Sequence, residues 1–487
     1  MKELKTITID PITRLEGHGK IVIFLDEKGS VENAYFQIPE LRGFERFCEG
    51  RKAEDLPQIV SRICGVCPPA HHFASTKALD AAFNVEPPPA AKKLRELMYS
   101  GYYIYDHTLH FYFLGAPDFV VGPDAPPAER NILGVIKKVG LDIAGEVIKH
   151  RAYGQRITAM IGGKATHPAC GLPGGISKGL TEEERQEIEK MAESSVAFAK
   201  FSLKLFDDVV LKNKKYVDLI LSDMYTLKTY YMGLVDENNK VNFYDGKVRV
   251  VDPQGREFVK FAPSEYLDMI EEHVEEWTYT KLPYLKKVGW KGLVDGPTSG
   301  VYRVGPLGRL NASEGMATPL AQQEYERMYE TLGGRPVHST LAFHWARLIE
   351  LLYAAERTLE LSRDEEITSK EIRNKPGPTG EGVGIIEAAR GTLIHHYKLD
   401  EEGLVKKVNL IVATTNNAPA ICMSIRDAAK GLIHGTDVSE GVLNMVEMAF
   451  RAYDPCWACA THLAIGQMPL QLKIYDHNKN LLKTLRR

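Results

Sequence analysis

Two Cys-x-x-Cys pairs at opposite ends of the chain constrain its fold more than any other feature. The first pair is Cys64 and Cys67, and the second is Cys456 and Cys459, in a sequence of 487 residues. Thiolates three positions apart can reach one metal from a single turn or helix start, where the helix also favours the ionised thiolate. Four such sulfurs can hold zinc, nickel or an iron–sulfur cluster. Because the two pairs lie near opposite ends of the chain, they can share one metal site only if a large core folds and brings them together.

The simplest interpretation of the two pairs is a structural zinc site. Zinc ribbons place their pairs roughly 15–20 residues apart, whereas nearly the whole sequence separates these two. A histidine follows each pair, at His71 and His462, and such a histidine can hydrogen-bond a metal ligand and orient it. The spacing alone therefore leaves open both a catalytic metal site and a non-catalytic, zinc-stabilised structural subunit of a redox complex.

Hydrophobic periodicity predicts an α-rich α+β fold with small β-hairpins. Thr181 and Glu184 form a capping box ahead of apolar residues that continue at helical spacing to Val209. No linker is evident, so we expect one compact body. Further helices are predicted in parts of 56–82, 92–114 and 439–452 and over 340–362, and hairpins at 18–38, 243–260 and 393–413.

Composition and charge exclude several classes of protein. A formal net charge of −3 indicates no nucleic-acid surface, and no apolar run reaches the roughly 18 residues of a membrane span. The N-terminus lacks a signal-peptide core, so a cytoplasmic protein is expected. An odd cysteine count argues against a disulfide scaffold, and Cys48, Cys170 and Cys422 receive no role. His395 and His396 would face opposite ways on a strand, so they are not expected to share a metal.

Both cysteine pairs lie in motifs that resemble those of [NiFe] hydrogenase large subunits. Residues 62–71 read R-x-C-G-x-C-x-x-x-H and residues 454–462 read D-P-C-x-x-C-x-x-H, which are the two signatures of that family. The resemblance implies the hydrogenase large-subunit fold, a central bundle of long helices with peripheral β-hairpins. Agreement extends over residues 7–462, with further matching segments at 12–18, 42–45, 106–112, 162–168 and 387–391.

Within the family, the sequence is most similar to the cytoplasmic methyl-viologen-reducing type, which is associated with heterodisulfide reductase. The segments 111–119, 343–350 and 382–390 carry this closer similarity. The implied activity is the reversible heterolytic cleavage of H2 to protons and electrons. Because the sequence has no further cysteine set for a cluster, the electrons would leave through an iron–sulfur small subunit. The next partners that the resemblance implies are an iron–sulfur adaptor subunit, then heterodisulfide reductase.

The resemblance implies a NiFe(CN)2(CO) centre on the four cysteines. Cys64 and Cys456 match the terminal ligands of nickel, and Cys67 and Cys459 match the two ligands that bridge nickel to iron. Cyanide and carbon monoxide complete the coordination of the iron, and no side chain supplies these ligands.

The same resemblance assigns the proton chemistry. The Cys456 sulfur matches the first proton acceptor, and Glu16 matches the acid that relays the proton; a glutamate away from water should have a raised pKa. Arg390 matches a guanidinium over the open site, held by Asp106 and Asp454. Without the resemblance, Glu16 would be a helix-start or surface carboxylate, and Arg390 would pair with the glutamate three residues before it.

Other residues match roles around this centre. His71 matches a histidine that donates to the second sulfur of the first pair, and Thr414 matches a hydroxyl donor to a cyanide ligand. Glu45 and His462 match ligands of a second metal, Mg2+ (or Fe2+), in an octahedral site that also includes one backbone carbonyl, which we expect to be that of Leu410. Without the resemblance, Thr414 would be a strand threonine and Glu45 a surface ion-pair partner of the neighbouring arginines.

Residues 1–462 are predicted to form the hydrogenase domain with the active site, and residues 463–487 a C-terminal extension. In this family a maturation endopeptidase removes such an extension after nickel insertion, and cleavage would fall between His462 and Leu463. The alternative is that the extension is a final strand that stays, because Leu470, Leu472 and Ile474 alternate.

Overall fold

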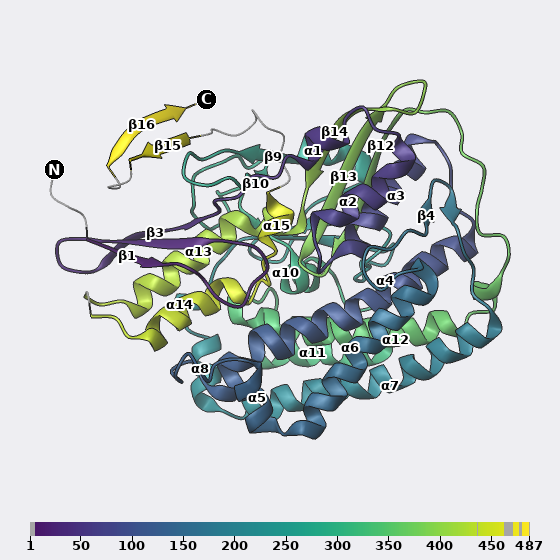
Figure 1. Cartoon of the computed structure of the whole chain (residues 1–487). Coiled ribbons are helices and arrows are strands. Elements are labelled where there is room, and N and C mark those ends of the chain that lie inside the picture. Colours follow the sequence, from purple (N-terminus) through teal and green to yellow (C-terminus); the bar gives the residue numbers. More distant parts are fainter. Residues whose placement is uncertain (1–4, 436, 462–470, 477–479, 487) are drawn as a thin grey trace.

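A bundle of long helices forms the lower part of the molecule in Figure 1. The computed structural model describes residues 5–435, 437–461, 471–476 and 480–486. The predicted α-rich architecture with a bundle of long helices is confirmed. The helices that pack along one another are α4 (Pro89–Leu109), α6 (Leu141–Gly162), α7 (Glu182–Phe206) and α12 (Phe343–Ser362).

The start of α7 shows how local sequence sets one of these helices. The Thr181 hydroxyl accepts from the Glu184 amide at 3.2 Å, and the Glu184 carboxylate accepts from the Thr181 amide at 3.0 Å. The predicted capping box is therefore confirmed, and it satisfies backbone donors that a helix start leaves unpaired. Ile188, Met191 and Phe198 follow at helical spacing on the buried face.

Replacing Thr181 with alanine is expected to lower the free energy of unfolding by about 1 kcal/mol, because the cap is lost while α7 stays packed. Thr181→Ser keeps the hydroxyl and should match the parent protein. Chemical denaturation followed by circular dichroism measures both variants. Equal midpoints for the alanine variant and the parent would show that the capping box adds no stability.

An antiparallel sheet lies in the upper part of Figure 1. Its strands are β12 (Glu381–Ala388), β13 (Gly391–Leu399) and β14 (Val405–Ile411), in that order. Helix α3 (Pro68–Ala82) packs so closely on β12 that a side-chain carbon at Gly384 would lie 2.2 Å from the Ala74 carbonyl oxygen. Glycine at this position lets α3, whose start carries the first cysteine pair, lie directly on the sheet.

All three predicted hairpins are confirmed as pairs of antiparallel strands, and the third ends two residues earlier than expected. Val412 is the N-cap of α13 (Ala413–Leu432), so the hairpin at 393–413 stops at Ile411. The sequence did not indicate α13, because Pro419 lies inside it and threonine and asparagine, which are weak helix formers, occupy positions 414–417 in its first turns. The confirmed hairpins are β2 (Lys20–Leu25) with β3 (Val31–Gln37), β7 (Lys247–Val251) with β8 (Glu257–Phe261), and β13 with β14.

Shorter elements connect these parts. The helices are α1 (Phe44–Cys48), α2 (Leu56–Val60), α5 (Ile132–Val139), α8 (Lys214–Ile220), α9 (Tyr266–Met269), α10 (Gly305–Ala312), α11 (Pro319–Thr331), α14 (Glu440–Arg451) and α15 (Trp457–Ala460). The strands are β1 (Lys5–Ile9), β4 (Gly171–Leu172), β5 (Gly175–Ile176), β6 (Tyr230–Val235), β9 (Ile270–His273), β10 (Leu282–Leu285) and β11 (Tyr302–Arg303).

The C-terminal residues form a separate hairpin at the upper left of Figure 1. Strand β15 (Gln471–Tyr475) pairs antiparallel with β16 (Leu481–Arg486), so Leu472 and Ile474 lie in a strand as their alternation predicts. Leu470 and the cleavage point between His462 and Leu463 lie outside the described residues, and the domain boundary stays a prediction.

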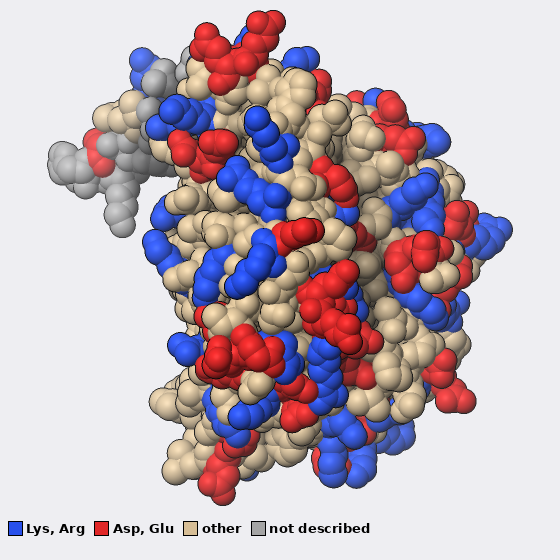
Figure 2. All heavy atoms as spheres, turned by 90° about the vertical axis from the view of Figure 1, so that its right-hand side faces the viewer, with Lys and Arg blue, Asp and Glu red and all other residues tan. Residues whose placement is uncertain are grey.

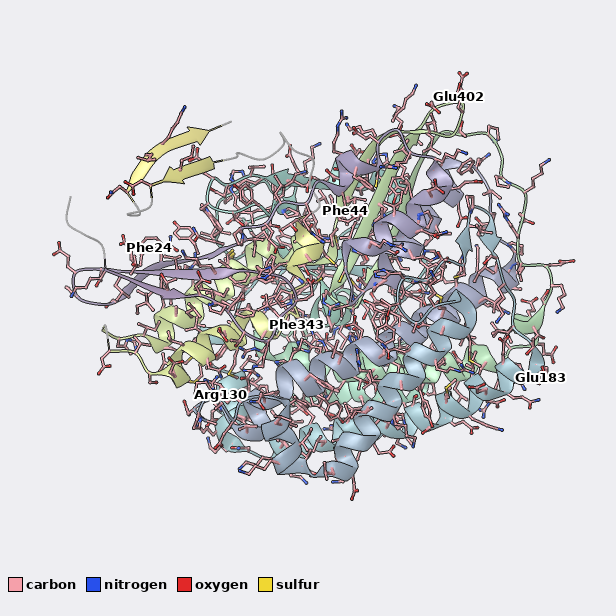
Figure 3. All side chains as sticks on the ribbon, viewed as in Figure 1. Phe24, Phe44, Arg130, Glu183, Phe343 and Glu402 are labelled. Atoms are coloured by element: carbon pink, nitrogen blue, oxygen red, sulfur yellow. The ribbon has the colours of Figure 1, made fainter. Side chains whose placement is uncertain are left out.

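A large apolar core runs through most of these elements, and a second apolar cluster lies between the strands β6, β7 and β8 and the sheet of β12, β13 and β14. Figure 3 shows Phe343 in the interior and Glu183 and Glu402 at the periphery. On the face shown in Figure 2, acidic and basic side chains are interspersed, which fits the small net charge. No helix in the part of the chain that the structure describes is long and apolar enough to cross a bilayer.

Candidate metal centre

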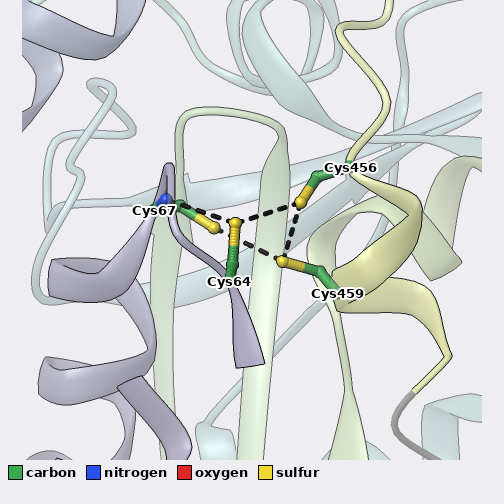
Figure 4. Close-up of side chains that lie close together, drawn as sticks. All are labelled: Cys64, Cys67, Cys456 and Cys459. Carbon is green, nitrogen blue, oxygen red and sulfur yellow. Dashed lines mark hydrogen bonds between the residues drawn. The ribbon is translucent and has the colours of Figure 1, made fainter. Parts of the chain in front are cut away.

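The four paired cysteines meet at one buried point (Figure 4). Cys64 Sγ lies 3.2 Å from Cys456 Sγ, and Cys67 Sγ lies 3.4 Å from Cys459 Sγ. Cys456 Sγ and Cys459 Sγ are 3.0 Å apart, and all four sulfurs lie within 4.8 Å of one another. The two ends of the chain therefore share one site, as the cysteine pairs suggested.

Each pair is presented at the start of a helix. Cys67 is the N-cap of α3, whose first turn contains two prolines, and Cys456 is the N-cap of α15. Proline is favoured there because its missing N–H would be unpaired in a first turn. The amides of Val66 and Cys67 donate to Cys64 Sγ at 3.2 and 3.4 Å, and such donors favour a thiolate.

Glu16 lies against the second pair. Its backbone forms a parallel bridge with Cys456, and its carbonyl accepts from the Trp457 amide at 3.0 Å. Glu16 Oε2 lies 2.9 Å from Cys456 Sγ and accepts from the Ala458 amide at 3.1 Å. A side-chain carbon at Gly17 would lie 2.8 Å from the Ala458 nitrogen, so glycine allows this approach. Burial raises the pKa of Glu16, and the surface-carboxylate alternative is wrong.

Arg42 ties the two cysteine loops together. Its Nη2 donates to the carbonyl oxygens of Ile63 and Ala458, each of which directly precedes a cysteine of the cluster. Its backbone amide donates to the Thr461 carbonyl at 2.7 Å. One guanidinium thus holds both loops, a task that suits its fixed fork of donors. In the sequence, Arg42 is recognisable only as part of a matching segment and as a neighbour of Glu45.

Arg390 is buried beside the sulfurs, between two carboxylates. Its Nη1 donates to Asp106 Oδ2 at 3.1 Å, and its Nη2 lies 3.0 Å from Asp454 Oδ2. Burial opposes its charge, but these carboxylates and the sulfurs raise the pKa of Arg390 well above its usual value. Burial raises the pKa of Asp454 to about 7. Glu387, the alternative partner of Arg390, binds Arg309 at 2.7 Å, so that alternative is wrong.

Thr414 and His71 both contact the second cysteine pair. The Thr414 hydroxyl accepts from the Cys456 amide at 2.9 Å in the first turn of α13, so Thr414 is not a strand residue. His71 Nε2 lies 3.5 Å from Cys459 Sγ. The resemblance paired His71 with Cys67, whereas the contact found here is with the other bridging candidate.

Glu45 lies next to the backbone of Leu410. It is 1% exposed and accepts from the Leu410 amide at 2.8 Å. Arg46 forms its ion pair with Glu49, so the surface-pair alternative for Glu45 is wrong. His462 lies outside the described residues, and the second metal site stays a prediction.

The donor set fits a soft cation. Burial raises the pKa of Cys456 and Cys459 well above the ordinary thiol value, so the sulfurs can all ionise only beside added positive charge. Arg390 Nε and Asp106 Oδ1 are buried and have no hydrogen-bond partner among the described residues, as expected where a further polar group faces them. Sulfur ligands select nickel, zinc or iron over magnesium and calcium.

Comparison with known protein families indicates which of these metals the four sulfurs bind. The model of the nickel-dependent hydrogenase family matches residues 42–131 and 146–462, and a HoxL-like model matches residues 6–41. The chain belongs to the nickel-dependent hydrogenase family. The four-sulfur cluster of this hydrogenase fits a nickel–iron centre, and the zinc-stabilised structural subunit is set aside.

Individual relatives are similar in sequence to this hydrogenase along nearly its whole length. It is 51% identical to an F420-non-reducing hydrogenase iron-sulfur subunit of Archaeoglobus profundus, over 99% of this chain and 100% of the relative. It is 42% identical to an F420-non-reducing hydrogenase subunit of Methanothermobacter thermautotrophicus, over 98% and 99%. A solved NAD+-reducing [NiFe]-hydrogenase in the H2-reduced state matches with a TM-score of 0.89 and 37% identity, over 94% and 99%. The predicted large-subunit fold is confirmed, and the protein is an oxidoreductase that acts on H2.

Proposed function

We propose that this subunit holds a NiFe(CN)2(CO) centre and there catalyses the reversible heterolytic cleavage of H2. Cys64 and Cys456 would bind nickel alone, and Cys67 and Cys459 would bind both nickel and iron. The observation that carries the proposal is the 2.9 Å contact of Cys456 Sγ with Glu16 Oε2, beside sulfurs that all lie within 4.8 Å. When bound, the centre supplies a Lewis-acidic metal pair that polarises H2.

Glu16 takes a proton from Cys456 Sγ at Oε2 and passes it outward. The oxygen is within hydrogen-bond reach of the sulfur, and burial raises the pKa of this carboxyl, so it can hold a proton closer to neutral pH. The Ala458 amide fixes the same oxygen, and the backbone bridge to Cys456 fixes the segment. The geometry of proton transfer therefore depends little on side-chain freedom.

Arg390 and Thr414 line the open side of the site. Asp106 and Asp454 hold the guanidinium at its two terminal nitrogens, so the Nε–H, which has no hydrogen-bond partner among the described residues, can face a small polar ligand such as cyanide. The Thr414 hydroxyl accepts from the Cys456 amide, and a hydroxyl that accepts one bond can still donate its proton to a second cyanide.

We also infer a second site for Mg2+ (or Fe2+), formed by Glu45, His462 and the Leu410 carbonyl with water. The support is that Glu45 is buried against the Leu410 backbone. A cation with octahedral coordination by oxygen ligands would balance the charge of this carboxylate. The proposed mature domain is 1–462. A maturation endopeptidase would remove 463–487.

Electrons leave this subunit through a partner. The described residues contain one group that could hold a metal through three or more His, Cys, Asp or Glu ligands, and Cys48, Cys170 and Cys422 are outside it. We therefore propose an iron–sulfur small subunit, then an iron–sulfur adaptor and heterodisulfide reductase, in the cytoplasm. Relatives that are named as subunits of F420-non-reducing hydrogenases support an enzyme of several subunits.

Purification without oxygen from the native host tests the proposal in one experiment. Elemental analysis should find about one nickel per chain and an excess of iron, because four soft sulfurs favour these metals. Mass spectrometry of the same sample should find a chain that ends at His462 together with an iron–sulfur subunit. Zinc without nickel, in a chain that has already lost residues 463–487, would contradict the proposal.

A further inference from the structure

A chain of hydrogen bonds leads away from the sulfur of Cys459. His71 Nε2 lies 3.5 Å from that sulfur, and His71 Nδ1 lies 3.2 Å from His395 Nε2. His395 Nδ1 lies 2.6 Å from the hydroxyl oxygen of Tyr397, which donates to Ser75 Oγ at 3.0 Å. These four residues are at most 1% exposed, so they exchange hydrogen bonds with one another rather than with bulk water.

The protons in this chain must all point the same way. A neutral imidazole carries one N–H, so it donates through one nitrogen and accepts through the other. While Tyr397 donates to Ser75, its oxygen receives the Nδ1–H of His395. The Nε2 of His395 then receives the Nδ1–H of His71. His71 is left with an Nε2 lone pair toward Cys459, which suits a thiol that donates its S–H.

A metal-bound Cys459 favours the opposite direction. A thiolate has no proton to donate, so a lone pair facing it is unfavourable and an N–H donor is favourable. His71 then donates from Nε2 and accepts at Nδ1 from the Nε2–H of His395. His395 in turn accepts at Nδ1, where Tyr397 lies at 2.6 Å. Metal binding removes one proton from the chain of hydrogen bonds: the S–H proton of Cys459 passes to His71 Nε2, the Nδ1–H of His71 to His395 Nε2, and the Nδ1–H of His395 to the Tyr397 oxygen. The former phenol proton leaves through the Ser75 hydroxyl, so that the phenol O–H points to His395.

We propose that Tyr397 is a positioning residue for the metal centre. Its O–H points to His395 instead of Ser75 when Cys459 binds metal, so that His71 donates an N–H to the Cys459 sulfur. This inference rests on the proposed function, because it concerns a sulfur that would bind iron. A hydrogen bond to that sulfur withdraws electron density from the metal. Buried hydrogen bonds in series reinforce one another, so the phenol acts through two imidazole rings.

Infrared spectroscopy of the loaded enzyme tests this role. The stretching band of CO on iron moves to lower wavenumber when the iron becomes more electron-rich. Tyr397→Phe should therefore lower the band position and the midpoint potential while nickel content stays unchanged. Ser75→Ala should leave the band in place, because Tyr397 keeps His395 as its acceptor. Tyr112→Phe is the matched control, since this buried tyrosine also bonds a serine, Ser202 at 2.8 Å.

The outcomes separate the possible errors. An unshifted band in Tyr397→Phe, or an equal shift in Tyr112→Phe, would overturn the positioning role. A parent enzyme with neither nickel nor a CO band would refute the proposed function, and this inference with it. If Tyr397→Phe does not fold, 3-fluorotyrosine at the same position keeps the shape and is a stronger donor. It should raise the band position, and an unshifted band there would also overturn the inference.

Discussion

Replacement of Cys456 by serine is expected to abolish H2 turnover and to lower the nickel content of the purified subunit. Serine offers a hard oxygen that ionises far less readily than a thiol, whereas nickel in a four-sulfur site requires soft thiolates. The same sulfur lies 2.9 Å from Glu16 Oε2, so its removal also breaks the proposed proton route. Changing a residue that only supports a ligand typically costs about 10–100-fold, so loss of this ligand should exceed about 100-fold. Hydrogen-dependent reduction of methyl viologen and elemental analysis measure both effects.

Cys422→Ser is the matched control for this variant. Cys422 is also a buried thiol, 2% exposed on α13, but it lies outside the sulfur cluster. This variant should keep nickel and turnover near the parent values. Full nickel and full turnover in Cys456→Ser would refute the four-sulfur centre. A parent-like nickel content without turnover would instead mean that Cys456 acts in proton transfer and is not needed to hold nickel.

The metal ligands could be predicted because their signal is local. Cys64 and Cys67 are three residues apart, and two prolines follow them, so a segment of about ten residues is enough to predict a turn and the start of a helix. The capping box at Thr181 is equally local. Helix α13 lacks such a signal, because Pro419 lies inside it and weak helix formers, threonine and asparagine, fill its first turns.

The contacts around the ligands could not be derived from the sequence in the same way. Glu16 reaches Cys456 through a backbone bridge between the two ends of the chain, and no local pattern encodes that pairing. Arg42 holds both cysteine loops for the same long-range reason. Glu387 is close to Arg390 in sequence, but its carboxylate lies buried against Arg309. Proximity along the chain therefore predicts the wrong ion-pair partner for Arg390. These contacts depend on the assembled core.

Glu16→Gln is expected to reduce H2 turnover by about 10²–10⁴-fold, the usual contribution of a positioned acid–base group. The amide has the same shape, and its oxygen can still accept from the Ala458 amide, so the segment should stay in place. It cannot take a proton from Cys456 Sγ as a carboxylate does. Nickel content and the infrared bands should therefore match the parent, while turnover falls. Glu324→Gln is the control, since burial also raises the pKa of Glu324 but this carboxyl pairs with Arg327 on α11.

Isotope experiments on Glu16→Gln locate the defect. Conversion of para- to ortho-hydrogen needs only splitting and recombination of H2 at the centre, so it should continue in the variant. Exchange of D2 with solvent protons requires that a proton leaves the site, so it should slow with turnover. Loss of both reactions with intact nickel would place Glu16 in the splitting step itself. Parent-like exchange would mean that protons leave by another route, because a glutamine at this position cannot carry them.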